Sequence, residues 1–282
     1  VSLRLALVAG AARGGWTAGS TRTGVCMKKY SVTPFRAGYN PVAGPSVGDD
    51  ELLMEFGLLS LCGKTGYTNQ EPLERAFLLV SGDVTFCWEG RRVRAARGRW
   101  KDDGPYCLHV PAGVAVRIEG HADHSELTVH QTENEKGFAS CLFAPGDAQN
   151  VQRGADTLDG STERIVRDII NQDSCPDSNL VLGEVILKPG RWGGYPNHYH
   201  PQPEVFFFKY YPSNGFGIAN VGDQAFLTAN NTAVKIPANC DHPCVCAPGY
   251  WQYSVWCIRN LPGDPYIKPT FNERFAALNA GW

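Results

Sequence analysis

The stretch PNHYHPQPEVFFFKYYP, residues 196–212, places two histidines one residue apart, a glutamate four positions later, and then an unbroken aromatic run. Side chains alternate between the two faces of a β-strand, so residues an even number of positions apart point to the same side. His198, His200 and Glu204 satisfy that spacing. Phe and Tyr are enriched in strands. We therefore predict a strand that carries a cluster of metal-capable side chains at its start.

The rest of the chain from Ser31 onward is built in the same style. Short apolar or alternating runs of strand length are separated by Gly, Pro, Asn and Asp, which is the pattern of strands joined by turns. The two helical candidates are residues 161–170 and 272–279. This distribution predicts an all-β fold of jelly-roll barrels or sandwiches.

An internal repeat supports two similar halves. TNQEPLERAFLLVSG (68–82) aligns with HYHPQPEVFFFKYYP (198–212), and VPAGVAV (110–116) aligns with IPANCDH (236–242). We expect domains at 27–150 and 163–282, joined by a polar linker at 151–162. At the aligned positions the first half has Thr68, Gln70, Glu74 and Val116, and the second half has His198, His200, Glu204 and His242.

Only the second half therefore retains four metal-capable side chains. His242 returns on a later strand, after a turn shaped by Pro237 and Asn239. Three imidazoles and one carboxylate suit Zn²⁺, Mn²⁺ or Fe²⁺, and they leave coordination positions for water or a bidentate substrate.

Bulk properties exclude several other classes of function. The formal net charge is −2, whereas nucleic-acid and anionic-membrane partners normally require a basic surface. No apolar run approaches the roughly 18 residues of a membrane span. The ten cysteines contain no CxxC pair, so we expect reduced thiols and a cytoplasmic protein.

The first 26 residues differ in composition from the rest. They are rich in Gly, Ala, Ser, Thr and Arg, and residues 5–12 could be read as a short signal-peptide core. Arg13 follows that core in place of a small-residue cleavage site. We expect residues 1–26 to be a disordered extension.

These motifs resemble those of known families. HYHPQPE with PANCDH resembles the two cupin motifs, HxHx(3,4)E and PxGxxH, with Asn239 at the glycine position. The wider segments are 182–200, 206–223, 235–256 and 263–266. Together they resemble the uronate-isomerase family, which contains 5-deoxy-glucuronate isomerase and 4-deoxy-5-ketouronate isomerase. GRWGGYP (190–196) and the GFG turn at 215–217 are similar to the inositol-pathway branch.

The resemblance implies a bicupin that holds one divalent metal, Zn²⁺ or Mn²⁺ with Fe²⁺ as the alternative, through His198, His200, Glu204 and His242. It also implies aldose–ketose isomerisation of a uronate, 5-deoxy-D-glucuronate to 5-dehydro-2-deoxy-D-gluconate in myo-inositol catabolism. The expected partner is a small sugar acid, and a homo-oligomer is compatible with the fold.

Candidate residues for the chemistry follow from their position near the ligand strand. A general base must move a proton between adjacent carbons. The candidates for catalysis are Glu204, Glu184, Lys209 and Tyr210. The candidates for substrate binding are Arg167, Tyr211 and Tyr253, and either Arg167 or Lys209 could pair with the substrate carboxylate.

Two other functions use the same frame. An Fe(II)-dependent cupin dioxygenase would use the same three histidines and glutamate with O₂, and a non-catalytic sugar-binding bicupin would need no metal chemistry. The four retained ligand residues disfavour a pure binding protein, and the family-like segments around them favour the isomerase.

Overall fold

Strands account for nearly all regular structure in the computed structural model, which describes residues 27–31, 36–148 and 150–278. The prediction of an all-β protein is confirmed, since the helical elements in the described ranges are four short 3₁₀ helices: η1 (Pro45–Val47), η2 (Asp50–Leu52), η3 (Leu158–Gly160) and η4 (Glu273–Leu278). None of the described helices is long and apolar enough to cross a membrane. The expectation for residues 1–26 lies outside the described residues.

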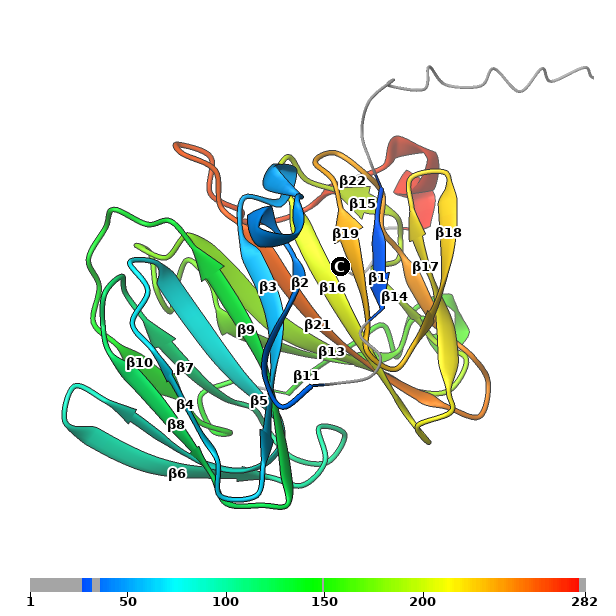
Figure 1. Cartoon of the computed structure of the whole chain (residues 1–282). Helices are drawn as coiled ribbons and strands as arrows, with labels where there is room; N and C mark the ends of the chain where they lie inside the picture. The colour runs from blue at the N-terminus through cyan, green and yellow to red at the C-terminus, as the bar shows by residue number, and fades with distance from the viewer. Residues whose placement is uncertain (1–26, 32–35, 149, 279–282) are drawn as a thin grey trace, which may run out of the picture.

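The first half forms one continuous nine-stranded sheet that bends into a barrel (Figure 1). Its central strand order is β10-β7-β5-β9-β3-β2, and β6 and β8 join through the far end of β5, with β4 next to β8. The bounds are β2 (Gly38–Ala43), β3 (Glu55–Cys62), β4 (Gly66–Asn69), β5 (Glu74–Trp88), β6 (Arg91–Arg97), β7 (Tyr106–Val110), β8 (Val116–Gly120), β9 (His124–Thr132) and β10 (Cys141–Phe143).

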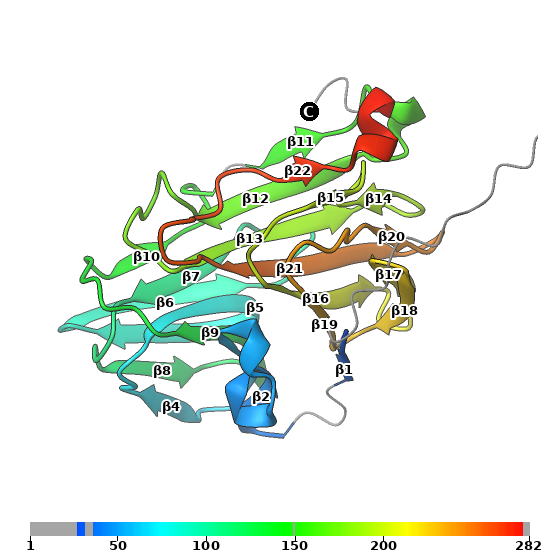
Figure 2. The ribbon, with the colours of Figure 1, turned by 90° about the horizontal axis from the view of Figure 1, so that it is seen from above.

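The second half places a seven-stranded sheet, in the order β1-β19-β16-β21-β13-β12-β11, beside a four-stranded sheet, β14-β20-β17-β18, and the β15-β22 pair. Figure 2 shows β12, β13, β21 and β16 side by side. The bounds are β11 (Val151–Arg153), β12 (Arg164–Ile170), β13 (Leu180–Leu187), β14 (Trp192–Gly193), β15 (His198–Tyr199), β16 (Glu204–Tyr211), β17 (Phe216–Val221), β18 (Gln224–Ala229), β19 (Thr232–Ile236), β20 (Cys244–Cys246), β21 (Trp251–Arg259) and β22 (Thr270–Phe271).

The aromatic run of β16 is apolar on both faces because both faces are buried. Val205 and Phe207 pack in a core shared by the two halves, which also contains Ala76 and Leu78 of β5. Phe208 points the other way, into the interior of the second barrel. A strand between two hydrophobic cores reads as a continuous apolar run and not as an alternating one.

The boundaries of the two halves differ from the expected ones. β1 (Lys29–Ser31) pairs with β19 of the second half, although its residues fall in the predicted first domain. β11 lies inside the expected linker and pairs with β12. The helix expected at 161–170 is wrong, because Arg164–Ile170 forms a strand in which Ile165 and Ile169 contact the shared core.

The repeat is real, but the alignment of the ligand positions is wrong by one residue. The backbone N–H of Asn239 donates to the carbonyl of His200 at 2.7 Å, and the equivalent N–H of Gly113 donates to Glu71 at 3.0 Å. Glu71 thus corresponds to His200, and Arg75 corresponds to Glu204. Both turn residues have positive φ, 59° for Asn239 and 78° for Gly113, a conformation that Gly adopts freely and Asn tolerates.

Candidate metal centre and its cavity

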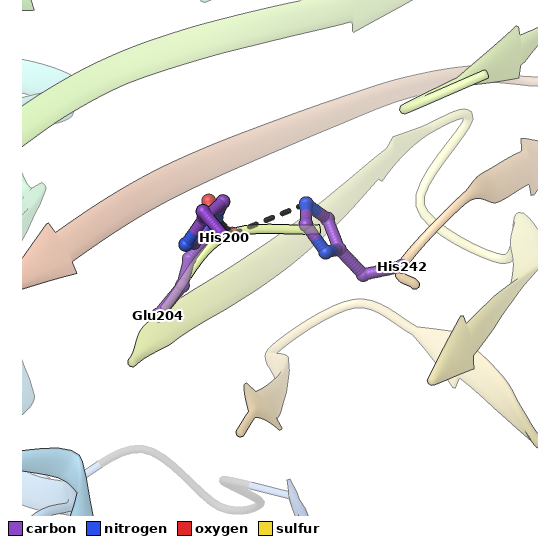
Figure 3. A group of neighbouring side chains, drawn as sticks. All are labelled: His200, Glu204 and His242. Atoms are coloured by element: carbon purple, nitrogen blue, oxygen red, sulfur yellow. Dashed lines mark hydrogen bonds and ion pairs between the residues drawn. The ribbon is translucent and has the colours of Figure 1, made fainter. Parts of the chain in front are cut away.

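Four polar side chains converge at the start of β16. The Glu204 Oε2 atom lies 3.1 Å from His200 Nε2 and 3.4 Å from His242 Nε2 (Figure 3). One ligand atom from each of these three residues lies within 4.8 Å of the others. His198 is adjacent, with its ring centroid 4.8 Å from that of His242 and the planes nearly perpendicular. All four side chains are buried.

Backbone carbonyls set the orientation of the three imidazoles. A carbonyl oxygen only accepts hydrogen bonds, so the ring nitrogen facing it carries the hydrogen. The Nδ1 atoms donate to carbonyls two residues away, His198 to Pro196 (3.1 Å), His200 to Gln202 (2.9 Å) and His242 to Cys240 (2.9 Å). Each neutral ring therefore keeps its lone pair on Nε2. This is the arrangement in which an imidazole binds a metal while its other nitrogen is held by the protein.

The electrostatics of the site fit a cation. Burial lowers the pKa of His200 to about 4 and also lowers the pKa of His198 and His242, which leaves the rings neutral at pH 7. Burial raises the pKa of Glu204 to about 7, although His242 opposes that shift. A carboxylate oxygen and an imidazole lone pair 3.1 Å apart are both acceptors, so a proton or a cation between them makes the contact favourable. His200, Glu204 and His242 can therefore hold a metal ion, with His198 beside them.

A cavity of about 470 Å³ opens onto this cluster, a volume typical of small-molecule sites. Its wall contains the four residues of the cluster and side chains from the pocket-facing side of the large sheet, among them Val166, Val185, Phe206, Trp256 and Ile258. The polar residues that join them include Arg153, Arg164, Asp168, Asp173, Tyr266 and Lys268. Tyr266 packs its ring against His200, with centroids 5.0 Å apart.

Glu184 does not face the cavity, which corrects its assignment as a base. It is fully buried on the opposite side of β13 and receives hydrogen bonds from Arg97 at 2.6 and 2.9 Å, from Arg167 at 3.1 Å and from the hydroxyl of Tyr253. The two guanidinium groups hold the pKa of Glu184 below its ordinary value against the effect of burial. Arg167 and Tyr253 lie in the same cluster and likewise do not line the cavity.

The three candidates at the end of β16 also lie elsewhere. Lys209 donates to Glu126 of the first half at 2.6 Å and to Asn231 at 2.9 Å. Tyr210 points into the second barrel, where its hydroxyl contacts Thr228 at 2.6 Å, but it does not reach the cavity. Tyr211 is exposed, and the guanidinium of Arg99 lies 5.8 Å from its ring centroid.

The sequence did hold a signal for two of the missed residues. Arg164 and Asp168 are four positions apart, an even step that puts both on one face of β12, and Arg167 lies on the other face. Reading this segment as a helix concealed that alternation. No local pattern identifies Tyr266 and Lys268, because they lie in the loop after β21 and reach the site only through tertiary folding.

Comparison with known proteins gives the family and the fold. The model of the KduI/IolB family matches residues 42–278. An IolB-like protein from Salmonella typhimurium superimposes with a TM-score of 0.79 at 20% identity, over 90% of this chain and 100% of that one. An oxalate decarboxylase from Lactobacillus farciminis gives 0.65 at 11% identity, over 90% and 91%. A cupin 2 conserved barrel domain protein from Leptotrichia buccalis gives 0.50 at 14%, over 82% and 96%. The fold is that of the cupins.

Proposed function

The chain belongs to the KduI/IolB family, a family of isomerases, and from this premise we propose that it is a metal-dependent aldose–ketose isomerase of a deoxy-uronate. The substrate we propose is 5-deoxy-D-glucuronate, converted to 5-dehydro-2-deoxy-D-gluconate in myo-inositol catabolism. The observation that supports this most is the buried cluster of His200, Glu204 and His242, with ligand atoms within 4.8 Å, at the wall of a 470 Å³ cavity.

The metal would be held by His200, Glu204 and His242 with His198 as the fourth ligand. When bound, a divalent cation supplies a Lewis acid that polarises a carbonyl and stabilises the negative charge of an enediolate. The chain supplies the rest of the environment. Neutral imidazoles fixed through Nδ1 present their lone pairs to one point, and Val185, Phe206 and Trp256 form an apolar wall of the same cavity.

Isomerisation moves one proton from the hydroxyl-bearing carbon to the neighbouring aldehyde carbon and a second proton from the hydroxyl oxygen to the former aldehyde oxygen, so a base must face the cavity. We assign that role to Asp168 of β12. Its carboxyl group lines the cavity and is accessible from it, and the surrounding protein raises its pKa above the ordinary value while Arg153 opposes the shift. A raised pKa brings the carboxylate nearer to the optimum of a base that works near neutral pH.

Turnover in the absence of oxygen tests the function. The metal-loaded protein is incubated anaerobically with 5-deoxy-D-glucuronate in D₂O, and the product is followed by NMR. We expect the ketose to form without oxygen and to carry deuterium at the carbon that receives the proton. Failure to convert this uronate, or conversion that requires O₂ and consumes it, would contradict the proposal, the latter in favour of a dioxygenase.

A further inference from the structure

Two arginines face each other at the edge of the large sheet in the second half. Arg153 of β11 and Arg164 of β12 are direct cross-strand partners in an antiparallel pair, so their side chains leave the sheet on the same face. Both line the cavity that contains the metal-ligand cluster. Like charges in directly opposite positions destabilise a sheet, and an anion bound between the two guanidinium groups would offset that repulsion.

Arg164 is buried in the wall of the cavity, and its guanidinium is held by the protein. Its side chain is only 4% exposed, and its Nη1 donates to the backbone carbonyl of Thr162 at 2.9 Å, which fixes the guanidinium. Burial, and then the charge of Arg153, lowers the pKa of Arg164 to about 10, so the group stays charged at neutral pH. A buried, oriented guanidinium is suited to bidentate contact with a carboxylate.

Two residues of opposite charge lie at different positions along the cavity face of β12. Arg164 begins the strand, and Asp168 follows four residues later on the same face, about 13 Å along the strand at roughly 3.3 Å per residue. Asp168 is in register, through Gly183 and Trp256, with Phe206, which lies two residues from Glu204, whereas Arg164 is in register, through Leu187 and Gln252, with Tyr210. Along the sheet the acidic group therefore lies nearer to the level of Glu204, and the cationic pair lies further along the cavity wall.

We propose that Arg164 and Arg153 form the carboxylate-binding clamp that makes this cavity select sugar acids over neutral sugars. The inference rests on the proposed function for the identity of the sugar, but the clamp itself requires only a carboxylate ligand. Arg164 provides the fixed, buried contact, and the exposed Arg153 provides the second charge at the mouth. The two arginines replace Arg167 and Lys209, which are engaged with Glu184 and Glu126.

The test compares two ligands that differ only in the carboxylate, 5-deoxy-D-glucuronate and 5-deoxy-D-glucose. Steady-state kinetics and calorimetry are measured on the metal-loaded wild type and on Arg164→Met and Arg153→Gln. We expect Arg164→Met to weaken uronate binding by about 10- to 100-fold, the range for loss of a charge-assisted hydrogen-bonded contact, with little change for the neutral sugar. Arg153→Gln should give a smaller loss of the same kind, about 3- to 10-fold.

Arg94→Gln is the matched control, since Arg94 is an exposed arginine of the first half that pairs with Asp83 at 2.6 Å. This variant should bind both ligands with the affinity of the wild type. If Arg164→Met, with the metal still bound, loses affinity for both ligands equally, the clamp is overturned and Arg164 has a purely structural role. Equal affinity of the wild type for the two ligands would overturn it as well. If Arg164→Met does not fold, Arg153→Gln decides the question by the same comparison.

Calorimetry separates the failure of the clamp from the failure of the proposed function. If the wild type does not isomerise 5-deoxy-D-glucuronate but still binds it in preference to 5-deoxy-D-glucose, and loses that preference in the arginine variants, the function falls and the clamp stands.

Discussion

A single step along β12 separates residues with different roles. Asp168 faces the cavity, and its neighbour Arg167 faces the core between the two halves, where it pairs with Glu184 at 3.1 Å. The same step on β16 separates Glu204, in the metal-ligand cluster, from Val205 in the shared core. The chemistry available to a residue of this sheet therefore depends first on the face that it occupies.

Replacement of Asp168 tests its role as the base. Asp168→Asn keeps the shape of the side chain and removes the proton acceptor, so kcat should fall by about 10²- to 10⁴-fold with a smaller change in KM. Metal content should stay the same, because Asp168 is outside the ligand cluster. Asp173→Asn, at another carboxylate of the cavity wall, is the comparison, and a larger loss there than in Asp168→Asn would show that the base is misassigned.

Because His130 is buried in its neutral form, we expect it to make the free energy of unfolding sensitive to acid. It is fully buried beside Phe56, with ring centroids 5.3 Å apart, and burial lowers its pKa to about 3. Between about pH 6.5 and 3 the unfolded chain binds a proton at this position and the folded chain does not, so acidification lowers the free energy of unfolding, by at most about 1.4 kcal/mol per pH unit.

Urea unfolding of the wild type and His130→Leu between pH 7 and 4.5 measures this contribution. The wild type should lose more stability over that interval than the variant. Parallel pH dependence in the two proteins would show that His130 is not kept neutral by the fold.

At the scale of strands, the two halves use equivalent positions in different ways. Arg75, at the position of Glu204, places its guanidinium inside the first barrel and donates to Asn69 Oδ1 and to the carbonyl of Val114, both at 2.6 Å. Glu74, the residue first matched with Glu204, faces the other way and contacts His109 at 2.8 Å and the backbone N–H of Asn179 at 2.8 Å. A side-chain cation thus occupies the degenerate site where the second half has its candidate metal ligands.

The sequence predicted the positions of the strands better than the face of the sheet that each side chain occupies. The four residues singled out by their spacing do lie together, but not through even steps within one strand. His198 belongs to β15, His200 follows that strand, and Glu204 begins β16 of another sheet. The roles assigned to Glu184, Tyr253, Lys209 and Tyr211 depended on which of two buried faces each strand turned to the cavity. Because β13, β16 and β21 are buried on both sides, hydrophobic alternation could not mark the side that holds the site.

The ion pair between Arg97 of β6 and Glu184 of β13 predicts a structural role for Glu184. Glu184→Ala leaves the buried guanidinium groups of Arg97 and Arg167 without their counter-charge, which should cost about 3–5 kcal/mol of unfolding free energy. Denaturant unfolding measures this loss, and kcat of the folded variant should stay within about twofold of the wild type. Asp83→Ala, which breaks the exposed pair with Arg94, should cost no more than about 1 kcal/mol.

A large loss of kcat in a stably folded Glu184→Ala protein would show that Glu184 has a role in catalysis.

At the scale of the whole molecule, the first half supports the second through buried contacts. Lys235 of β19 is 1% exposed and pairs with Asp49 and, at 2.8 Å, with Glu51, and Lys209 of β16 pairs with Glu126 at 2.6 Å. Lys209 belongs to β16, which begins with Glu204, and Lys235 belongs to the neighbouring β19, and all three carboxylate partners belong to the first half. The first half therefore fixes the back of the sheet that carries Glu204.

These contacts join residues far apart in the chain, such as Asp49 and Lys235. They could not be predicted from sequence, because nothing in the local pattern around either residue indicates its partner. The internal repeat did predict two barrels, since the same succession of strand, turn and strand occurs twice. The exchange of β1 into the second half has no counterpart in that pattern.

We propose that His200, Glu204 and His242 hold a divalent metal on which isomerisation depends. The most direct test is elemental analysis of the purified protein and of His200→Ala, combined with anaerobic turnover of 5-deoxy-D-glucuronate by both. His124→Ala, at an exposed histidine of the first half that contacts Ser60 at 3.0 Å, is the control. We predict about one equivalent of metal per chain in the wild type and the control, with metal and activity lost together in His200→Ala. Full activity in a metal-free protein, or unchanged metal content and activity in His200→Ala, would show that isomerisation does not depend on a metal held by these residues.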